Sequence, residues 1–342
     1  MSSQTFPRDL VVDVHDIAAI ILNCHAQLET EFAGYQLVEV NRGSTPLQTL
    51  PEGTLPPEWY IMRHRSVVYI LKKEPNAPSP VTIDTFAHPN GVKTPNGEPL
   101  SRKELEDVFW RCKCFNSGNV LTYVAQQVFD ALPSSSKLLA RTSQGHTVTC
   151  AAHETTVAEI AVKSREACLH VVYNDRPDLG PTKVDLGHRL SGFDGSFQWV
   201  WLFIGPPTSS SIREDARVAL DLSISQIGGR GCGFEFFALE KTAHHYENVL
   251  LKFAVDLGED MKLSAKQMLT PVNVQHGDAV KRLVLERLAK VVAGDDHFCR
   301  YCGKDNVDLI CSRCKKAHFC RECQALGWKY HKRWCQLPDI SQ

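Results

Sequence analysis

Apolar positions recur at helical spacing in several parts of the chain. Residues 8–30 and 278–293 each carry an apolar stripe with this period, and both segments are predicted to be helices. Gly294 follows the second stripe, where a helix often ends in a glycine cap. Ser101 and Glu104 have the spacing of a capping box, which predicts the start of another helix.

Other segments favour extended backbone because β-branched and aromatic residues are concentrated in them. From residue 211 onward the pattern is mostly helical up to residue 293, apart from a glycine cluster at 228–233. The body of the chain, up to about residue 294, is therefore predicted to have an α+β fold. The predicted strands are 59–71, 81–86, 146–150, 168–173 and 198–204.

Composition narrows the classes of function. The chain has 342 residues, 43% of them hydrophobic and 23% charged, which is typical of a globular protein with a real core. Its 38 Lys and Arg residues balance 39 Asp and Glu residues, so the net charge favours neither a nucleic-acid nor a membrane partner. The longest apolar runs, 17–22 and 199–204, are far shorter than the ~20 residues that cross a bilayer. With no secretory pattern at the start of the sequence, we expect an intracellular protein of the cytoplasm or nucleus.

Cysteine is the most informative residue type. Seven of the 13 cysteines lie from Cys299 to Cys335, and together with His331 they form four ligand pairs with zinc-knuckle spacing. Eight ligands fill two closed tetrahedral sites, so two structural Zn²⁺ ions are predicted, with no chemistry at the metals. His318 is an alternative ligand, and spacing alone leaves open how the pairs combine. The eight predicted ligands are Cys299, Cys302, Cys311, Cys314, Cys320, Cys323, His331 and Cys335.

The segment 299–335 resembles the MYND zinc finger, especially where Cys323-Gln324 is followed by Trp328, His331 and Cys335. The resemblance covers about a tenth of the chain. It implies an interleaved arrangement in which the first and third ligand pairs share one zinc and the second and fourth pairs share the other. The sequence departs from the family in one place, because only two residues separate Cys320 from Cys323 where three are usual.

The same resemblance implies a partner. MYND fingers bind proteins, often through short peptides of the form Pro-x-Leu-x-Pro, whose prolines fix an extended shape in advance. Gln324 and Trp328 would line the peptide groove, whereas Trp328 could instead pack inside the finger. With both zincs bound, the finger carries a charge of about +3. No stacked aromatic series accompanies this charge, so a nucleic-acid partner is not expected.

One segment of this chain has the form of such a peptide, Pro177-Asp178-Leu179-Gly180-Pro181. It suggests that the finger docks on this segment, within one chain or between two copies. An ordinary turn is the simpler interpretation, because Pro, Asp and Gly are the residues that turns favour.

Enzyme signatures are weak in this sequence. Gly229-Arg230-Gly231 loosely resembles the opening of a SET-type lysine methyltransferase, but most of that catalytic domain follows the finger, and only seven residues follow Cys335 here. His153-Glu154 lacks the second histidine of a metalloprotease helix. An enzyme would be distinguished by a body pocket lined with convergent titratable groups.

We therefore expect two parts, a body at 1–294 of no assigned family and a MYND-type finger at 295–342. The expected function is a zinc-binding adaptor or regulator that acts by protein–protein interaction. The alternative is an enzyme, for example with a lysine methyltransferase-like activity, whose site lies in the body while the finger recruits its substrate.

Overall fold

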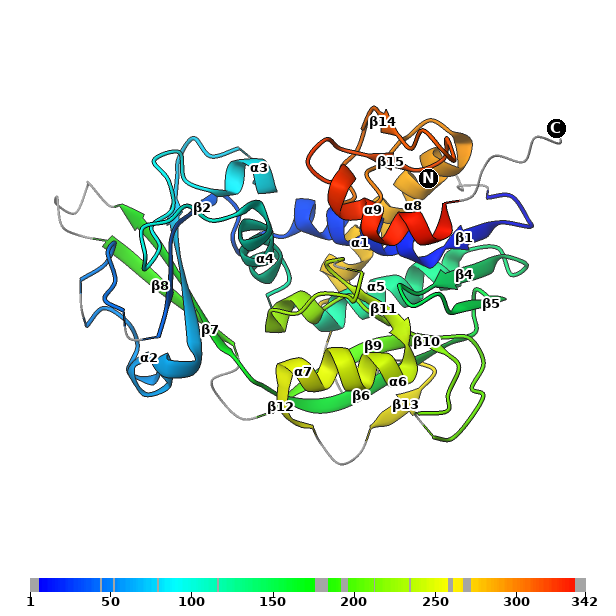
Figure 1. The fold of residues 1–342 in the computed structure, drawn as a ribbon, viewed down its shortest axis with the longest axis horizontal. Coiled ribbons are helices and arrows are strands. Elements are labelled where there is room, and N and C mark those ends of the chain that lie inside the picture. Colours follow the sequence, from blue (N-terminus) through cyan, green and yellow to red (C-terminus); the bar gives the residue numbers. More distant parts are fainter. Residues whose placement is uncertain are drawn as a thin grey trace.

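The structure is a computed structural model that describes residues 6–43, 45–51, 53–78, 80–115, 117–175, 184–191, 196–211, 213–233, 235–257, 261–266 and 272–335. Figure 1 shows two lobes, with a four-stranded sheet on the left and the remaining sheets, the long helices and the C-terminal finger on the right.

The larger sheet of the right lobe has the order β11-β10-β9-β6-β12, with β13 also paired to β6. Every pairing in it is antiparallel. Strand β9 lies at its centre and is buried from Trp199 to Ile204, as its apolar sequence predicts. The strands are β6 (Thr155–Ser164), β9 (Phe197–Ile204), β10 (Val218–Asp221), β11 (Ala238–Lys241), β12 (Ala254–Leu257) and β13 (Lys262–Ser264).

The left lobe is built on the sheet β2-β3-β7-β8. Strands β3 and β7 are parallel and central, and their long sequence separation allows the crossover connection that a parallel pair requires. These strands are β2 (Tyr35–Arg42), β3 (Ser66–Lys73), β7 (Ala167–Asp175) and β8 (Val184–Ser191), and short helices α2 (Pro57–Met62) and α3 (Ile83–Phe86) belong to the same part of the chain.

Helix α1 is buried along most of its length and joins the parts of the right lobe. It packs against α5 and α8, and a small sheet β1-β4-β5 lies beside it (Figure 1). The predicted capping box of α4 is present, with Ser101 accepting from the Glu104 backbone N–H. The helices are α1 (Val14–Leu28), α4 (Arg102–Lys113), α5 (Gly118–Ala131) and α8 (Val274–Ala293), and the strands are β1 (Val11–Asp13), β4 (Lys137–Arg141) and β5 (Thr147–Ala151).

One interrupted helical segment covers part of the larger sheet. Helix α6 (Thr242–His244) passes into a π-helical turn at His245–Leu250 and then into α7 (Leu251–Phe253). A 3-10 turn at Ile224–Ile227 precedes β11, and another at Arg63–Arg65 follows α2.

The finger consists of a hairpin and one helix, β14 (Leu309–Ile310), β15 (His318–Phe319) and α9 (Gln324–Trp334). It sits above α1 in Figure 1. Finger side chains such as Phe298, Tyr301 and Phe319 belong to the same buried apolar cluster as α1, α4 and α5. The finger is therefore packed onto the body rather than carried on a free linker.

Three predictions of local structure are wrong. The N-terminal half of the predicted strand 59–71 is helix α2, which begins at Pro57, a residue favoured in the first helical turn. The predicted strand 81–86 is helix α3, which has a capping box between Thr82 and Thr85. Between 211 and 264 the chain forms four short strands, because pairing within the sheet outweighs their local preference.

A two-zinc centre in the finger

The cysteine-rich segment brings its ligands together in two groups of four. The first contains Cys299, Cys302, Cys320 and Cys323, and the second contains Cys311, Cys314, His331 and Cys335. Within each group, one ligand atom from every residue lies within 4.8 Å of the others. The pairs are therefore interleaved rather than sequential, which is the arrangement that the resemblance implies.

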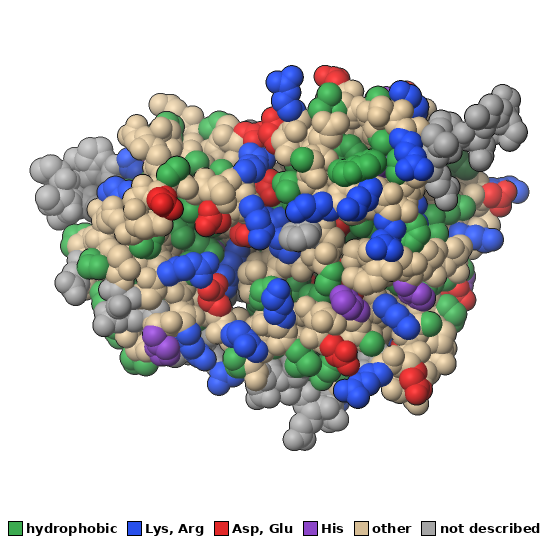
Figure 2. Space-filling model, viewed as in Figure 1, with side chains coloured by type: hydrophobic (Ala, Val, Ile, Leu, Met, Phe, Trp, Pro, Cys, Tyr) green, Lys and Arg blue, Asp and Glu red, His purple; other side chains and the backbone are tan. Residues whose placement is uncertain are grey.

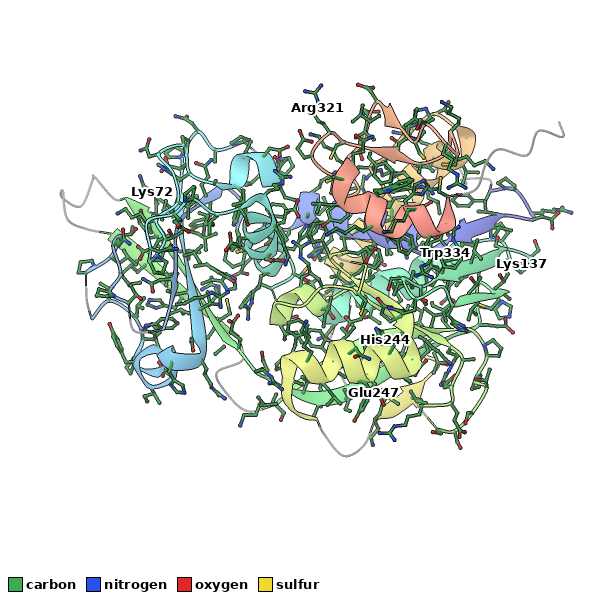
Figure 3. The ribbon with its side chains drawn as sticks, viewed as in Figure 1. Lys72, Lys137, His244, Glu247, Arg321 and Trp334 are labelled. Atoms are coloured by element: carbon green, nitrogen blue, oxygen red, sulfur yellow. The ribbon has the colours of Figure 1, made fainter. Side chains whose placement is uncertain are left out.

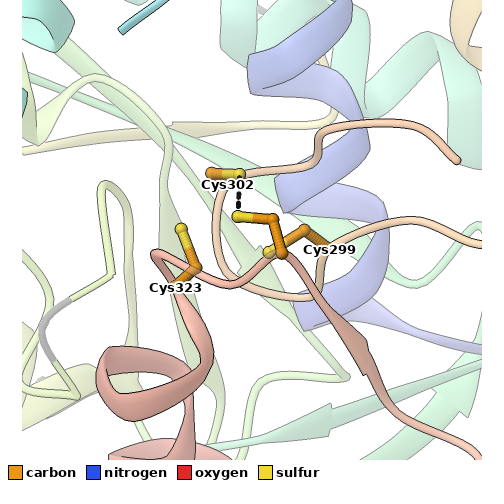
Figure 4. Close-up of side chains that lie close together, drawn as sticks. Cys299, Cys302 and Cys323 are labelled. Carbon is orange, nitrogen blue, oxygen red and sulfur yellow. Dashed lines mark hydrogen bonds between the residues drawn. The ribbon is translucent and has the colours of Figure 1, made fainter. Parts of the chain in front are cut away.

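Distances inside the groups suit tetrahedral metal sites. The Sγ atoms of Cys302 and Cys320 are 3.9 Å apart, and those of Cys311 and Cys335 are 3.7 Å apart. Two thiolates bound 2.3 Å from one tetrahedral ion would lie about 3.8 Å from each other. Figure 4 shows Cys299, Cys302 and Cys323 converging on one point, the first two from one turn of the backbone and Cys323 from the start of α9. The donor set and its geometry fit one Zn²⁺ ion in each group.

Each knuckle is shaped by a tight turn that brings its two sulfurs together. The turn at Cys299–Cys302 closes with Gly303 in the left-handed region, at φ +76°, and its N–H donates to the Cys299 carbonyl. Lys315 plays the same part after Cys314, at φ +56°. Such positive-φ turns aim successive side chains at one point, which explains the two-residue spacing of the ligands.

The third knuckle leads directly into a helix. Its turn closes when the Cys323 and Gln324 N–H groups donate to the Cys320 carbonyl, and α9 begins at Gln324. The two residues inside the turn are both exposed, and Figure 3 shows Arg321 pointing away from the finger. The short spacing is thus accommodated without displacing either ligand.

The histidine of the second group is available as a metal ligand. Burial, reinforced by the nearby Arg300 guanidinium, lowers the pKa of His331 to about 4, so its imidazole is neutral at ordinary pH. A neutral imidazole is the form that coordinates zinc. His318 lies in neither group and instead stacks on His297, with ring centroids 4.3 Å apart.

The site and its setting define a zinc-binding finger attached to an α+β body. Residues 299–335 match the family model of the MYND finger. The chain therefore contains a MYND finger with two structural zinc sites, a module that typically binds other proteins. No curated protein matches the chain, and no solved structure matches it. The prediction of two zinc ions is confirmed.

The two residues expected to contact a peptide lie one helical turn apart on α9. Gln324 is exposed, and Trp328 is 43% exposed with its ring centroid 5.7 Å from that of His331. Residues four apart share one face of a helix, so both side chains are presented together. The segment Pro177–Pro181 lies outside the described residues.

The opposite side of the finger is fixed to the body by polar contacts. Arg300 forms an ion pair with Asp16 of α1 at 2.7 Å, and the Tyr330 hydroxyl donates to the Arg141 carbonyl at 2.7 Å. Gly303 lies so close to α1 that a Cβ atom there would be 2.3 Å from the Ala19 carbonyl oxygen. One surface of the finger thus packs against the body, and the surface that carries Trp328 remains exposed.

A charged histidine lies at this junction. The ring of His15 stacks on Tyr330 with centroids 3.9 Å apart, and its Nε2 is 3.5 Å from the Glu235 carboxylate. Burial by itself would lower the pKa of His15, but the carboxylates of Asp16 and Glu235 outweigh burial and raise the pKa to about 9. At neutral pH the junction therefore holds an imidazolium between two carboxylates.

The body contains a cavity of about 510 Å³ between the lobes. Most of its lining surface is apolar, but several charged side chains reach it, and convergent titratable groups are what the enzyme alternative requires. His146, Cys112 and Cys114 in the body have ordinary structural roles. The His146 ring bonds to the Ala216 carbonyl, and Cys112 and Cys114 are buried thiols whose pKa burial raises. The charged and polar residues of the cavity are Arg42, His64, Arg65, Ser66, Arg165, Glu166 and Lys252.

No helix among the described residues is long and apolar enough to cross a membrane.

Proposed function

We propose that the protein is a zinc-dependent adaptor or regulator whose finger, residues 295–342, binds proline-containing peptides while the body, residues 1–294, holds the finger in a fixed orientation. The observation that carries this proposal is the exposed Trp328 beside the buried zinc ligand His331. A tryptophan left 43% exposed loses a large contact area with water when a partner covers it.

The two strands of the finger support the same function. Strand β15 packs under α9, since a Cβ atom at Gly327 would lie 2.5 Å from the Phe319 ring. The other side of β15 is occupied, because the Arg300 N–H donates to the His318 carbonyl. Strand β14 pairs only with β15 within the described residues, and its Leu309 and Ile310 side chains are 36% and 40% exposed.

An open edge of this kind can accept an extended peptide as an added strand. Backbone hydrogen bonds would supply affinity, and a flat aromatic ring would select proline, whose φ is already fixed near the extended value. Figure 2 shows Lys and Arg side chains spread over the finger, and residues 299–335 contain nine of them against three acidic residues. The preferred peptide is therefore neutral or acidic as well as proline-containing.

The test is peptide binding by the full-length, zinc-loaded protein, measured by fluorescence anisotropy with a labelled Pro-x-Leu-x-Pro peptide. We expect Trp328→Ala to weaken binding by about tenfold or more, as loss of an aromatic hot spot does. Gln324→Ala should cost less, because one exposed hydrogen bond is worth about 1 kcal/mol.

Tyr60→Ala is the matched control, because Tyr60 is also exposed, at 37%, but lies on α2 in the other lobe. It should bind the peptide as the wild type does. Equal binding by wild type and Trp328→Ala, with two zincs retained in both, would show that the finger does not recognise peptides through this face.

A further inference from the structure

A third group of metal-binding side chains lies in the body, outside the finger. Cys232, Glu240 and His244 each place one ligand atom within 4.8 Å of the other two. All three come from one short stretch of chain: the loop before β11, the strand β11 itself and the end of α6. Figure 3 shows His244 on this helical segment, directly before the π-helical turn. Such turns occur frequently at functional sites.

The distances resemble those in the finger. The Sγ atom of Cys232 is 3.1 Å from Nε2 of His244, and the corresponding pair in the finger, Cys314 and His331, is 3.5 Å apart. Sulfur and nitrogen ligands of one tetrahedral zinc ion lie about 3.5 Å from each other. Only small side-chain movements would therefore bring Cys232 and His244 onto a common ion.

The charge of the side chains around Cys232, Glu240 and His244 also favours the binding of a cation. Glu240 is 1% exposed, and it accepts hydrogen bonds from the Cys232 backbone N–H at 2.9 Å and from the Ser143 hydroxyl. Within the described parts of the chain, Lys, Arg and His side chains form no ion pair with Glu240. A buried carboxylate without a cation is costly, and a bound metal ion would remove that cost.

A second buried carboxylate adds to the negative charge. Glu235 is 4% exposed, and its oxygens occupy the space next to Gly233, where a Cβ atom would lie 2.3 Å from Oε1. Its cationic neighbour is His15 at 3.5 Å, so this imidazolium is already paired with Glu235 rather than with Glu240. The glycines around Cys232 thus allow the loop to approach these carboxylates closely.

The same side chains have a second interpretation, as a nucleophile and its base. Nδ2 of the Asn248 amide lies 3.1 Å from Nδ1 of His244. The Cys232 thiol, the His244 imidazole and the Asn248 amide therefore follow one another in the order of a nucleophile, its base and an orienting group. The backbone N–H of Cys232, which would stabilise an oxyanion, is instead donated to Glu240. A carboxylate beside the thiol also opposes the thiolate unless a cation is present. The geometry thus favours metal binding, in which Nε2 of His244 holds the ion and Nδ1–H is donated to the Asn248 side-chain oxygen once that amide is turned over.

The loop that carries Cys232 is held in place by the finger and by α4. Arg230 donates to the Tyr301 hydroxyl at 2.9 Å and forms an ion pair with Asp107 at 2.5 Å. This anchoring fixes the backbone two residues before Cys232. Ligands on a fixed backbone bind a metal without a large loss of conformational entropy.

We propose that Cys232, Glu240 and His244 bind a third metal ion, Zn²⁺ or another divalent transition metal of similar softness, and leave one coordination position open. Sulfur, carboxylate and imidazole together match the ligands that zinc accepts. Cys232 is exposed, so the open position faces solvent, whereas the finger sites are closed by four ligands each. Three protein ligands with an open position are typical of catalytic zinc sites, where water or a substrate group completes the coordination.

The test uses full-length protein whose finger is already loaded with two Zn²⁺ ions, titrated with Co²⁺. Cobalt bound to a thiolate absorbs light by charge transfer from sulfur, and released zinc is measured in the same sample with a chromogenic chelator. We expect one equivalent of Co²⁺ to bind with a charge-transfer band and without zinc release. His244→Ala should weaken this binding by on the order of 100-fold, more than the loss of a residue that only orients a ligand.

Three further variants make the result specific. Cys232→Ser should remove the charge-transfer band, and Asn248→Ala should weaken binding only about tenfold. His153→Ala is the matched control, because His153 is exposed and distant from the group in sequence, and it should bind cobalt as the wild type does. Alkylation of Cys232 by iodoacetamide should be slowed by Co²⁺ in the wild type and unaffected by it in His244→Ala.

The proposal is overturned if cobalt enters only by displacing finger zinc. It is also overturned if His244→Ala and Cys232→Ser bind cobalt as tightly as the wild type, or if alkylation of Cys232 is insensitive to cobalt. In the last case, rapid alkylation that depends on His244 would assign the pair to nucleophile chemistry instead.

Discussion

The finger and the body are stabilised in different ways although they share one packed core. The finger has two short strands and one helix, so it relies on eight metal ligands to hold its backbone. The body has long buried elements such as β9 and α1, whose apolar side chains supply its stability. The comparison shows that a segment too small to be stabilised by burial of apolar side chains can still present a rigid surface. It does so because metal ions fix its backbone and the larger body packs against one of its sides.

The largest effect should come from removing one zinc ligand. Cys299→Ser is expected to lose the first zinc and the ordered structure of the finger, because a structural zinc contributes about 10–16 kcal/mol in small fingers. The body should stay folded, because its long buried elements such as β9 and α1 do not depend on metal for their burial. Zinc content and hydrogen exchange along the chain would measure both parts.

The matched control is Cys150→Ser, which changes another buried thiol, in β5, outside both zinc groups. It should retain both finger zincs and lose about 1 kcal/mol or somewhat more from imperfect burial of a hydroxyl. If Cys299→Ser unfolds the body together with the finger, the two regions are one cooperative unit and the comparison fails.

A smaller effect should come from disturbing only the contact between the two regions. Gly303→Ala would place a methyl group 2.3 Å from the Ala19 carbonyl oxygen of α1, at a backbone φ of +76°. We expect a loss of about 2–4 kcal/mol in the free energy of unfolding, from steric overlap and from the strained backbone. Chemical denaturation of the zinc-loaded protein would measure it.

Gly294→Ala separates these two causes. Gly294 has a similar φ, +82°, but no heavy atom lies within 4 Å of the position that its Cβ would occupy. Its replacement should therefore cost about 1 kcal/mol, from backbone strain alone. Equal losses in the two variants would mean that the finger is not pressed against α1.

An effect no larger than that of Gly303→Ala should appear as a pH dependence. Because the pKa of His15 is raised to about 9 from an ordinary value of 6.5, its charge stabilises the folded junction fully below pH 6.5. This contribution, up to about 3 kcal/mol, is lost as the pH rises through 9. Denaturation midpoints between pH 6 and 10 would follow it.

His15→Gln removes the titrating group and should flatten that part of the pH profile. Groups other than His15 would still titrate, so the difference between the two profiles is the informative quantity. An unchanged profile would show that His15 does not carry its charge between Asp16 and Glu235.

The local sequence pattern was sufficient to predict the structure in two cases. One is a metal site whose ligands are mostly cysteine, and the other is a helix with a clear apolar stripe. The zinc ligands and the helix ending at Gly294 follow from spacing alone, because knuckles and helix caps involve neighbours in sequence. The strands between 211 and 264 could not be predicted in this way. They are short, and their extended form depends on pairing: β12 and β13 pair with β6, which is distant in the chain, β10 pairs with β9, and β11 pairs with β10.

The sequence by itself determined that residues 299–335 form a two-zinc finger, since clustered thiols at fixed spacing bind metal in any fold that leaves them together. Only the tertiary structure decided which side of the finger is exposed and which side contacts α1. It also decided that Cys232, Glu240 and His244 meet, because their irregular spacing matches no motif. These three converge only when β11 pairs with β10 and the loop before β11 is held by Arg230.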